Sequence, residues 1–160
     1  RGQDEAAWLA VNNAAFSWHP EQGGWSRDRL EHELSAEWFD AEDLLVATEP
    51  ATSPPTMAGF CWTKLHPAAD PVLGAIYVIA VDPAHHGRGL GRALVHAGLV
   101  HLSDQGADAG MLWVESDNEV AGALYRDLGF TEHHRTTYYE SVGATGADEW
   151  PGERSGGATP

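Results

Sequence analysis

The chain has 160 residues, which is enough for one domain whose hydrophobic core needs no disulfide or metal ion to stabilise it. Its net charge of −15 argues against nucleic acids and anionic membranes as partners, because like charges repel. A single cysteine, Cys61, cannot form an internal disulfide, and no apolar run reaches the length of a membrane span, so we expect a cytoplasmic protein.

The first part of the chain predicts two helices followed by two strands. Residues 4–16 place apolar side chains at helical spacing, and Ser26 is a capping residue in front of a second such segment. Pro and Gly between residues 19 and 25 predict the loop that joins the two helices. Residues 43–49 and 57–66 predict strands, joined by a polar, Pro-rich connection.

The second part predicts alternating strands and helices. Residues 75–81 are apolar on both faces, as in a central strand. The elements expected after that strand are a long helix over 89–103, a short, fully apolar strand over 111–114, a helix over 118–128 ended by Gly129, and one or two closing strands over 131–141. Residues 1–142 thus predict one mixed α/β domain, and residues 143–160, which are rich in Gly, Ala and charge, predict a disordered tail.

The strongest chemical signal is a glycine-rich turn between the central strand and the long helix. Gly87, Gly89 and Gly91 would allow backbone N–H groups to converge on an anion, and the helix dipole adds partial positive charge there. Arg88 and Arg92 supply charge in an otherwise acidic protein. The alternative is a glycine-rich helix start without a ligand. The spacing fits neither a Rossmann fingerprint nor a P-loop.

This turn resembles a family signature. His86-Gly-Arg-Gly-Leu-Gly91 resembles the Gln/Arg-x-x-Gly-x-Gly/Ala motif of the GNAT acetyltransferases, with His86 in place of the usual Gln or Arg, and residues 114–118 and 123–130 resemble the family's second recurrent block. The resemblance implies the GNAT fold, of the α/β (α+β) class with a mixed central sheet flanked by helices, and acetyl-CoA as co-substrate. Because the chain begins at Arg1 rather than Met, we expect a piece of a longer protein whose first strand is missing or truncated.

The first half is similar to a narrower group. Asn12-Asn-Ala-Ala-Phe16, His19-Pro-Glu-Gln-Gly-Gly-Trp25, Trp38-Phe-Asp40 and residues 59–67 are similar to the catalytic C-terminal domain of the mycothiol synthases, which are tandems of two GNAT domains. The resemblance implies an N-acetyltransferase that acts on the cysteinyl amine of a cysteinyl-glucosaminyl-inositol, the last step of mycothiol biosynthesis, with a second GNAT domain in the full-length chain. Two alternatives stay open: a GNAT enzyme for another small amine or a peptide N-terminus, and a non-catalytic acetyl-CoA-binding domain.

The resemblance also implies roles for individual residues. The expected acetyl-CoA contacts are Ile79, Ala80, Val81, His86, Gly87, Arg88, Gly89, Leu90, Gly91, Arg92, Asn118, Glu119, Val120, Ala121, Gly122 and Ala123. The expected acceptor contacts are Glu21, Lys64 and Trp113, and Tyr125 matches the tyrosine near the coenzyme sulfur. Judged by residue type alone, Glu21 and Lys64 would be solvated charges, and Trp113 and Tyr125 would be core residues.

One position departs from the family pattern. Acyl transfer from a thioester to an amine needs a neutral amine, a polarised carbonyl and a proton for the leaving thiolate. The family places its Glu base where this sequence has Ala75, so the chain is an inactivated variant, uses another base, or binds without catalysing. By strand alternation we expect Ala75, Tyr77 and Ile79 to share one face. No cysteine cluster accompanies the nine histidines, so we expect no metal site.

Overall fold

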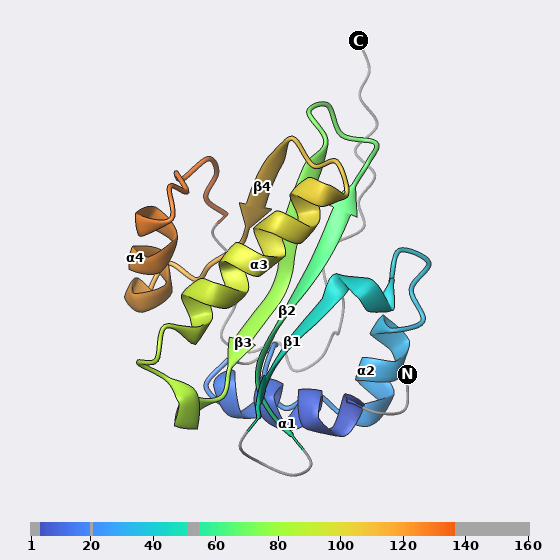
Figure 1. Ribbon diagram of the computed structural model, residues 1–160, viewed down its shortest axis with the longest axis vertical. Coiled ribbons are helices and arrows are strands. Elements are labelled where there is room, and N and C mark those ends of the chain that lie inside the picture. Colours follow the sequence, from blue (N-terminus) through green and yellow to red (C-terminus); the bar gives the residue numbers. More distant parts are fainter. Residues whose placement is uncertain (1–3, 20, 51–54, 137–160) are drawn as a thin grey trace, which may run out of the picture.

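The computed structural model of the protein describes residues 4–19, 21–50 and 55–136 (Figure 1). Its helices and strands are, in chain order, α1 (Glu5–Ala15), α2 (Arg27–Glu33), β1 (Leu44–Glu49), β2 (Thr56–His66), β3 (Leu73–Val81), α3 (Leu90–Asp104), β4 (Ala109–Leu112) and α4 (Glu119–Asp127), with short 3₁₀ turns η1 (Ala41–Asp43) and η2 (Pro83–His85). Residues 131–136 form no strand, and the other residues of the expected closing strands, like the expected tail, lie outside the described residues.

The four strands form one mixed sheet in the order β1-β2-β3-β4, which confirms the predicted fold class. β1, β2 and β3 are antiparallel neighbours, and β3 and β4 are parallel because α3 crosses over the sheet between them. In Figure 1 α3 crosses the near face of the sheet, and α4 lies beside the start of α3. Within the described ranges, no helix is long and apolar enough to span a membrane, and no three His, Cys, Asp or Glu side chains gather as a metal site requires.

Helix ends agree with the capping signals in the sequence. The Ser26 hydroxyl accepts a hydrogen bond from the Arg29 amide at 3.2 Å, and the Asn118 side chain accepts one from the Ala121 amide at 3.1 Å. Gly129 has φ +91°, a left-handed conformation that ends α4. The expected strand over 111–114 is wrong at its end, because β4 stops at Leu112 and Trp113 is 67% exposed.

The α1–α2 face of the sheet carries an aromatic core. The Trp8 ring lies 4.7 Å from Phe60, 5.3 Å from Trp25 and 6.0 Å from Trp62, measured between ring centroids. Leu30 of α2 is buried against the same cluster. Large rings therefore set the distance between these helices and the sheet.

The α3 face carries an aliphatic core with closer backbone contact. Leu94 and Val95 of α3 pack on Cys61 and Ile76 of the strands. Gly98 lies so close to β2 that an added Cβ atom would be 2.7 Å from the Cys61 Sγ. The helix reaches this distance because Gly98 has no side chain.

A β-bulge divides β3 at Tyr77. Trp62 pairs with Val78 and Thr63 pairs with Ile76, so Tyr77 has no partner on β2. The extra residue reverses the alternation: Tyr77 packs on Trp62 at the α1–α2 face, whereas Ile79 packs in the α3-face core. The expectation that Ile79 shares a face with Ala75 and Tyr77 is therefore wrong.

Candidate active site

The C-terminal half of β3 has an open edge. The last pair between β3 and β4 joins Ile76 to Leu112, whereas β3 continues to Val81. In the described part of the chain, no strand covers the β4-side edge of β3 from Tyr77 onward. Its backbone N–H and C=O groups are available to an extended ligand. The pairing between β3 and β4 ends next to the bulge residue Tyr77, and we call this position the notch.

The turn that follows β3 suits an anion. Gly87 and Gly89 have φ of +73° and +76°, and Gly89 is the N-cap of α3. These left-handed conformations favour glycine, as the sequence predicted. The first N–H groups of α3 have no intrahelical acceptor and carry the positive end of the helix dipole. Asp82 stabilises the start of the turn, since its carboxylate accepts a hydrogen bond from the Ala84 amide at 2.8 Å.

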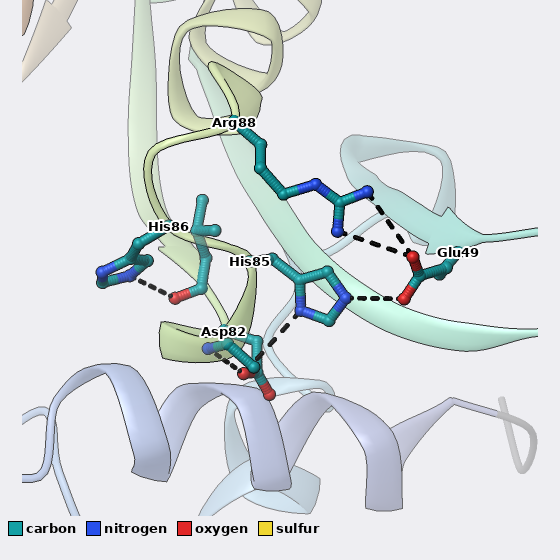
Figure 2. Close-up of polar contacts among 7 residues, drawn as sticks. Glu49, Asp82, His85, His86 and Arg88 are labelled. Atoms are coloured by element: carbon teal, nitrogen blue, oxygen red, sulfur yellow. Dashed lines mark hydrogen bonds and ion pairs between the residues drawn. The ribbon is translucent and has the colours of Figure 1, made fainter.

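The end of β1 braces this turn through a carboxylate (Figure 2). Glu49 contacts the His85 Nε2 at 2.9 Å, and its other oxygen lies 3.5 Å from both terminal nitrogens of Arg88. The His85 contact first, and then the Arg88 charge, lower the pKa of Glu49. On the other side of the turn, His86 lies 3.1 Å from the carbonyl oxygen of Val81. Arg88 therefore lies beside the turn and is paired with the Glu49 carboxylate. An anionic ligand would have to compete with Glu49 for the Arg88 guanidinium.

α4 borders the turn with its second half. The Arg92 guanidinium donates to the Asp127 carboxylate at 3.1 Å, and a Cβ atom at Gly91 would lie 3.7 Å from the Leu124 side chain. Residues 118–123, which the sequence assigns to the coenzyme, form the first half of α4, where Val120 is 84% exposed.

Tyr125 lies on the α3 side of the sheet. Its ring packs with Phe130, 5.9 Å between centroids, beside the aliphatic core. Within the described ranges its hydroxyl makes no hydrogen bond. Burial, with a smaller contribution from Cys61, raises the pKa of Tyr125, so the phenol keeps its proton at neutral pH. Burial also raises the pKa of the Cys61 thiol to about 12, which leaves it unsuited as a nucleophile.

A polar cluster lies on the opposite face of the same notch. The Tyr77 hydroxyl donates to the Glu33 carboxylate of α2 at 3.2 Å. The Lys64 ammonium lies 4.1 Å from the Trp38 ring centroid and 5.9 Å from that of Tyr77. Burial, followed by Glu33, raises the pKa of Tyr77 to about 12. We call these four residues the acceptor-side cluster.

Of this cluster, only Lys64 was predicted from the sequence as a site residue. Glu33 stands 44 positions before Tyr77, and nothing in their spacing links them. The available signal was a tyrosine in an otherwise aliphatic strand.

The position of the family's base and the other two predicted acceptor contacts are dispersed. Ala75 is 7% exposed and lies opposite Lys64 on the neighbouring strand. Glu21 lies in the loop after α1, where its carbonyl oxygen accepts a hydrogen bond from the Trp25 indole at 3.1 Å. The described residues show no hydrogen bond or ion pair between Glu21 and Lys64. Trp113 follows the end of β4, 6.4 Å from the His134 ring.

The sequence matches a known family and known proteins. Residues 8–130 match the model of the Acetyltransferase (GNAT) family. The chain is 45% identical over 141 residues to the mycothiol acetyltransferase of Nocardia farcinica, which covers 88% of this chain and 46% of that protein. It is 50% identical over 127 residues to the mycothiol acetyltransferase of Gordonia bronchialis, covering 79% of this chain and 40% of that protein. The chain spans less than half the length of these relatives.

Solved structures share the fold. The ribosomal-protein-S18-alanine N-acetyltransferase from Escherichia coli superposes with a TM-score of 0.65 and 28% identity, covering 89% of this chain and 81% of that one. A chain of the NatC complex bound to Gag peptide and CoA gives a TM-score of 0.69 at 22% identity, covering 84% of this chain and 81% of its own. At that identity the second likeness bears on the fold alone.

Proposed function

The chain belongs to the acetyltransferase (GNAT) family, and on this premise we propose that it transfers the acetyl group of acetyl-CoA to the cysteinyl amine of a cysteinyl-glucosaminyl-inositol, the last step of mycothiol biosynthesis. The observation that carries the proposal is the open edge of β3 between the glycine turn and the notch. The choice of acceptor rests on the relatives named mycothiol acetyltransferase. A cytoplasmic location and a second GNAT domain in the full-length protein belong to the same proposal.

Acetyl-CoA fits the open edge and the turn together. Its pyrophosphate would accept hydrogen bonds from the amides of residues 87–92, and its pantetheine arm would pair with the backbone of residues 79–81. The protein is strongly acidic, so the local dipole of α3 and the two arginines of the turn supply the attraction that the overall charge does not. Residues 118–123 of α4 would contact the coenzyme from the other side.

The reaction would take place at the notch, which groups from both faces of the sheet would reach. The neutral amine attacks the thioester carbonyl, backbone N–H groups of β3 polarise the carbonyl oxygen, and the C–S bond breaks as the amide forms. Tyr125, on the α3 side, would give its proton to the leaving thiolate, and the N–H proton that the attacking nitrogen loses on becoming an amide would restore the phenol through solvent. The acceptor would approach from the other face, where Lys64 lies, with Glu21 and Trp113 at the rim.

An assay with the cysteinyl substrate tests the proposal. The substrate carries its own thiol, so product is measured as the acetylated species by mass spectrometry rather than as released thiol. Treatment with hydroxylamine, which cleaves thioesters and spares amides, separates N-acetylation from S-acetylation. We expect a hydroxylamine-resistant product, and none from the glucosaminyl-inositol that lacks cysteine. Faster acetylation of a peptide N-terminus or an unrelated small amine would overturn the acceptor, and coenzyme binding without any product would identify a non-catalytic domain.

A further inference from the structure

The proposed reaction creates a demand for a proton acceptor that Ala75 cannot meet. An α-amine with a pKa of about 7.7–8.0 is mostly protonated at neutral pH, so one N–H proton has to leave before nitrogen attacks. Ala75 presents a methyl group on the α1–α2 face of β3, and its cross-strand neighbour Lys64 carries an ammonium without a lone pair. The acceptor has to come from another element that reaches the notch.

Tyr77 is the polar side chain that the bulge places at the notch. It is the unpaired residue of β3 and the first one beyond the end of the β3–β4 pairing. Its ring is held by Trp38 and Trp62, whose centroids lie 5.0 Å and 5.3 Å away, and it is 39% exposed, so a ligand can reach it. The fixed ring directs the hydroxyl toward Glu33 of α2.

The charges around this hydroxyl favour a proton relay. Glu33 and Arg29 face Tyr77 from α2, and Lys64 faces its ring from β2. Glu33 is the only carboxylate in this group, and it already accepts the Tyr77 proton in a hydrogen bond of 3.2 Å. The phenol oxygen keeps free lone pairs for a donor that arrives from the substrate side.

We infer that Glu33, acting through the Tyr77 hydroxyl, takes the proton that the acceptor amine loses, an inference that rests on the proposed acetyl transfer. The ammonium N–H bond breaks and its proton goes to the Tyr77 oxygen, while the Tyr77 O–H proton goes to the Glu33 carboxylate. The phenol is regenerated, the amine is neutral, and Glu33 is a carboxylic acid that returns the proton to solvent. Glu33 thereby does from α2 what the methyl group of Ala75 cannot do.

The decisive variant is Glu33→Gln, which keeps a hydrogen-bond acceptor for Tyr77 and removes the basic group. In the intact protein we expect kcat/KM at pH 7 to fall by up to about tenfold, because roughly a tenth of the amine is already neutral there, with acetyl-CoA affinity unchanged. The loss should shrink toward pH 9, because there the amine is already neutral without help. Glu31→Gln is the matched control, since Glu31 lies on the same helix and pairs with Arg27 at 2.7 Å in solvent.

A rescue variant separates proton transfer from packing. Ala75→Glu places a carboxylate on the same face as Tyr77, and we expect it to restore neutral-pH activity to Glu33→Gln by on the order of tenfold. In the wild type, which has its own base in Glu33, the same substitution should change kcat much less. A second readout needs no turnover: Glu33→Gln should lower the pKa of Tyr77, followed by NMR of labelled tyrosine, because the carboxylate helps to raise it.

The outcomes separate this inference from the proposed function. A wild type that acetylates the cysteinyl substrate, with chemistry rate-limiting and a pH profile that Glu33→Gln leaves unmoved, overturns the role of Glu33 and leaves the proposed function standing. A uniform loss at every pH, unrelieved by Ala75→Glu, overturns it as well, because a packing role would behave that way. A wild type that binds acetyl-CoA and acetylates no amine overturns both.

Discussion

The two faces of the sheet are built by different means. On the α1–α2 face, packed rings such as Trp8, Phe60 and Trp62 fill the core. The ring contacts extend from Trp62 to Trp38 and Tyr77, which are part of the acceptor-side cluster. On the α3 face the core is aliphatic. The helix there reaches the strands because a glycine stands at the contact.

This difference matches what each side is proposed to bind. A coenzyme recognised through backbone N–H groups needs turns and helix ends at fixed positions, and glycines and close packing provide them. An acceptor amine recognised through side chains needs charged and aromatic groups within reach, and the acceptor-side cluster provides both kinds. Apart from the two arginines of the turn, substitutions on the α3 side should therefore act through backbone geometry, with the Tyr125 hydroxyl as the one other side-chain exception.

The largest effect is expected for that exception. Tyr125→Phe keeps the ring packed on Phe130 and removes the proton proposed for the leaving thiolate. We expect kcat to fall by on the order of 10² to 10⁴, with coenzyme affinity nearly unchanged, as general acids of this kind contribute that much. Steady-state kinetics together with calorimetry check it. Full kcat in a variant whose chemistry is rate-limiting would reduce Tyr125 to a packing residue.

A backbone substitution in the turn should weaken coenzyme binding instead. Gly89→Val forces a branched residue into φ +76°, where space is open and only the conformation is unfavourable. We expect acetyl-CoA affinity to fall by roughly tenfold to a hundredfold in calorimetry, because the turn changes shape. Gly106→Val is the matched control at the other end of α3, since Gly106 has φ +95° and equally open space. Equal affinity losses in both variants would show that strain alone, and not the turn, is responsible.

Close packing on the α3 face predicts a stability effect without a binding effect. Gly98→Ala would bring a methyl group within 2.7 Å of the Cys61 Sγ and 3.3 Å of the Thr63 side chain. Overpacking of this kind costs about 1–3 kcal/mol, which denaturant unfolding would measure. Val100→Ala, at a position of α3 that is 46% exposed, should cost much less. A Gly98→Ala protein as stable as the wild type would contradict the tight contact between α3 and β2.

The smallest effect concerns the brace between β1 and the turn. Because its contact with His85 lowers the pKa of Glu49, this carboxylate stabilises the fold above the ordinary Glu pKa of about 4.3, and the contribution is lost as pH falls through the lower folded-state pKa. Thermal unfolding should therefore separate wild type from Glu49→Gln at pH 7 and bring them together in acid. A difference that stays constant down to pH of about 3 would assign the effect to packing.

Much of the fold followed from local signals, because α2 and α4 carry their own caps. Ser26, Asn118 and Gly129 mark helix ends within one or two residues of the observed ones. The end of β4 was misjudged because an apolar run does not reveal where a neighbouring strand stops, and Trp113 lies beyond the last pair with β3. The glycine turn could be predicted because its unusual backbone conformations depend on residue type alone.

The acceptor side could not be predicted in the same way. Glu33 and Tyr77 come into contact only because α2 packs on the sheet. From the sequence alone, Glu33 is predicted to be an ordinary surface residue of a helix. The bulge also has no local signal, since Tyr77 fits a regular strand equally well. Because the extra residue of the bulge was not anticipated, Ile79 was predicted on the wrong face of the sheet.

The bulge at Tyr77 gives β3 two phases within nine residues. Before it, odd-numbered side chains face the α1–α2 side, and after it even-numbered ones do, as Ala75 and Ala80 illustrate. Changes that adapt position 75 or 77 to a new acceptor therefore leave undisturbed the side chains of Ile79 and Val81, which pack on the α3-face core beside the edge proposed for the coenzyme. A single strand can in this way acquire a new substrate preference while the half proposed to bind the coenzyme stays constant. A one-residue deletion at the bulge would restore regular alternation, so that the two halves would no longer vary independently.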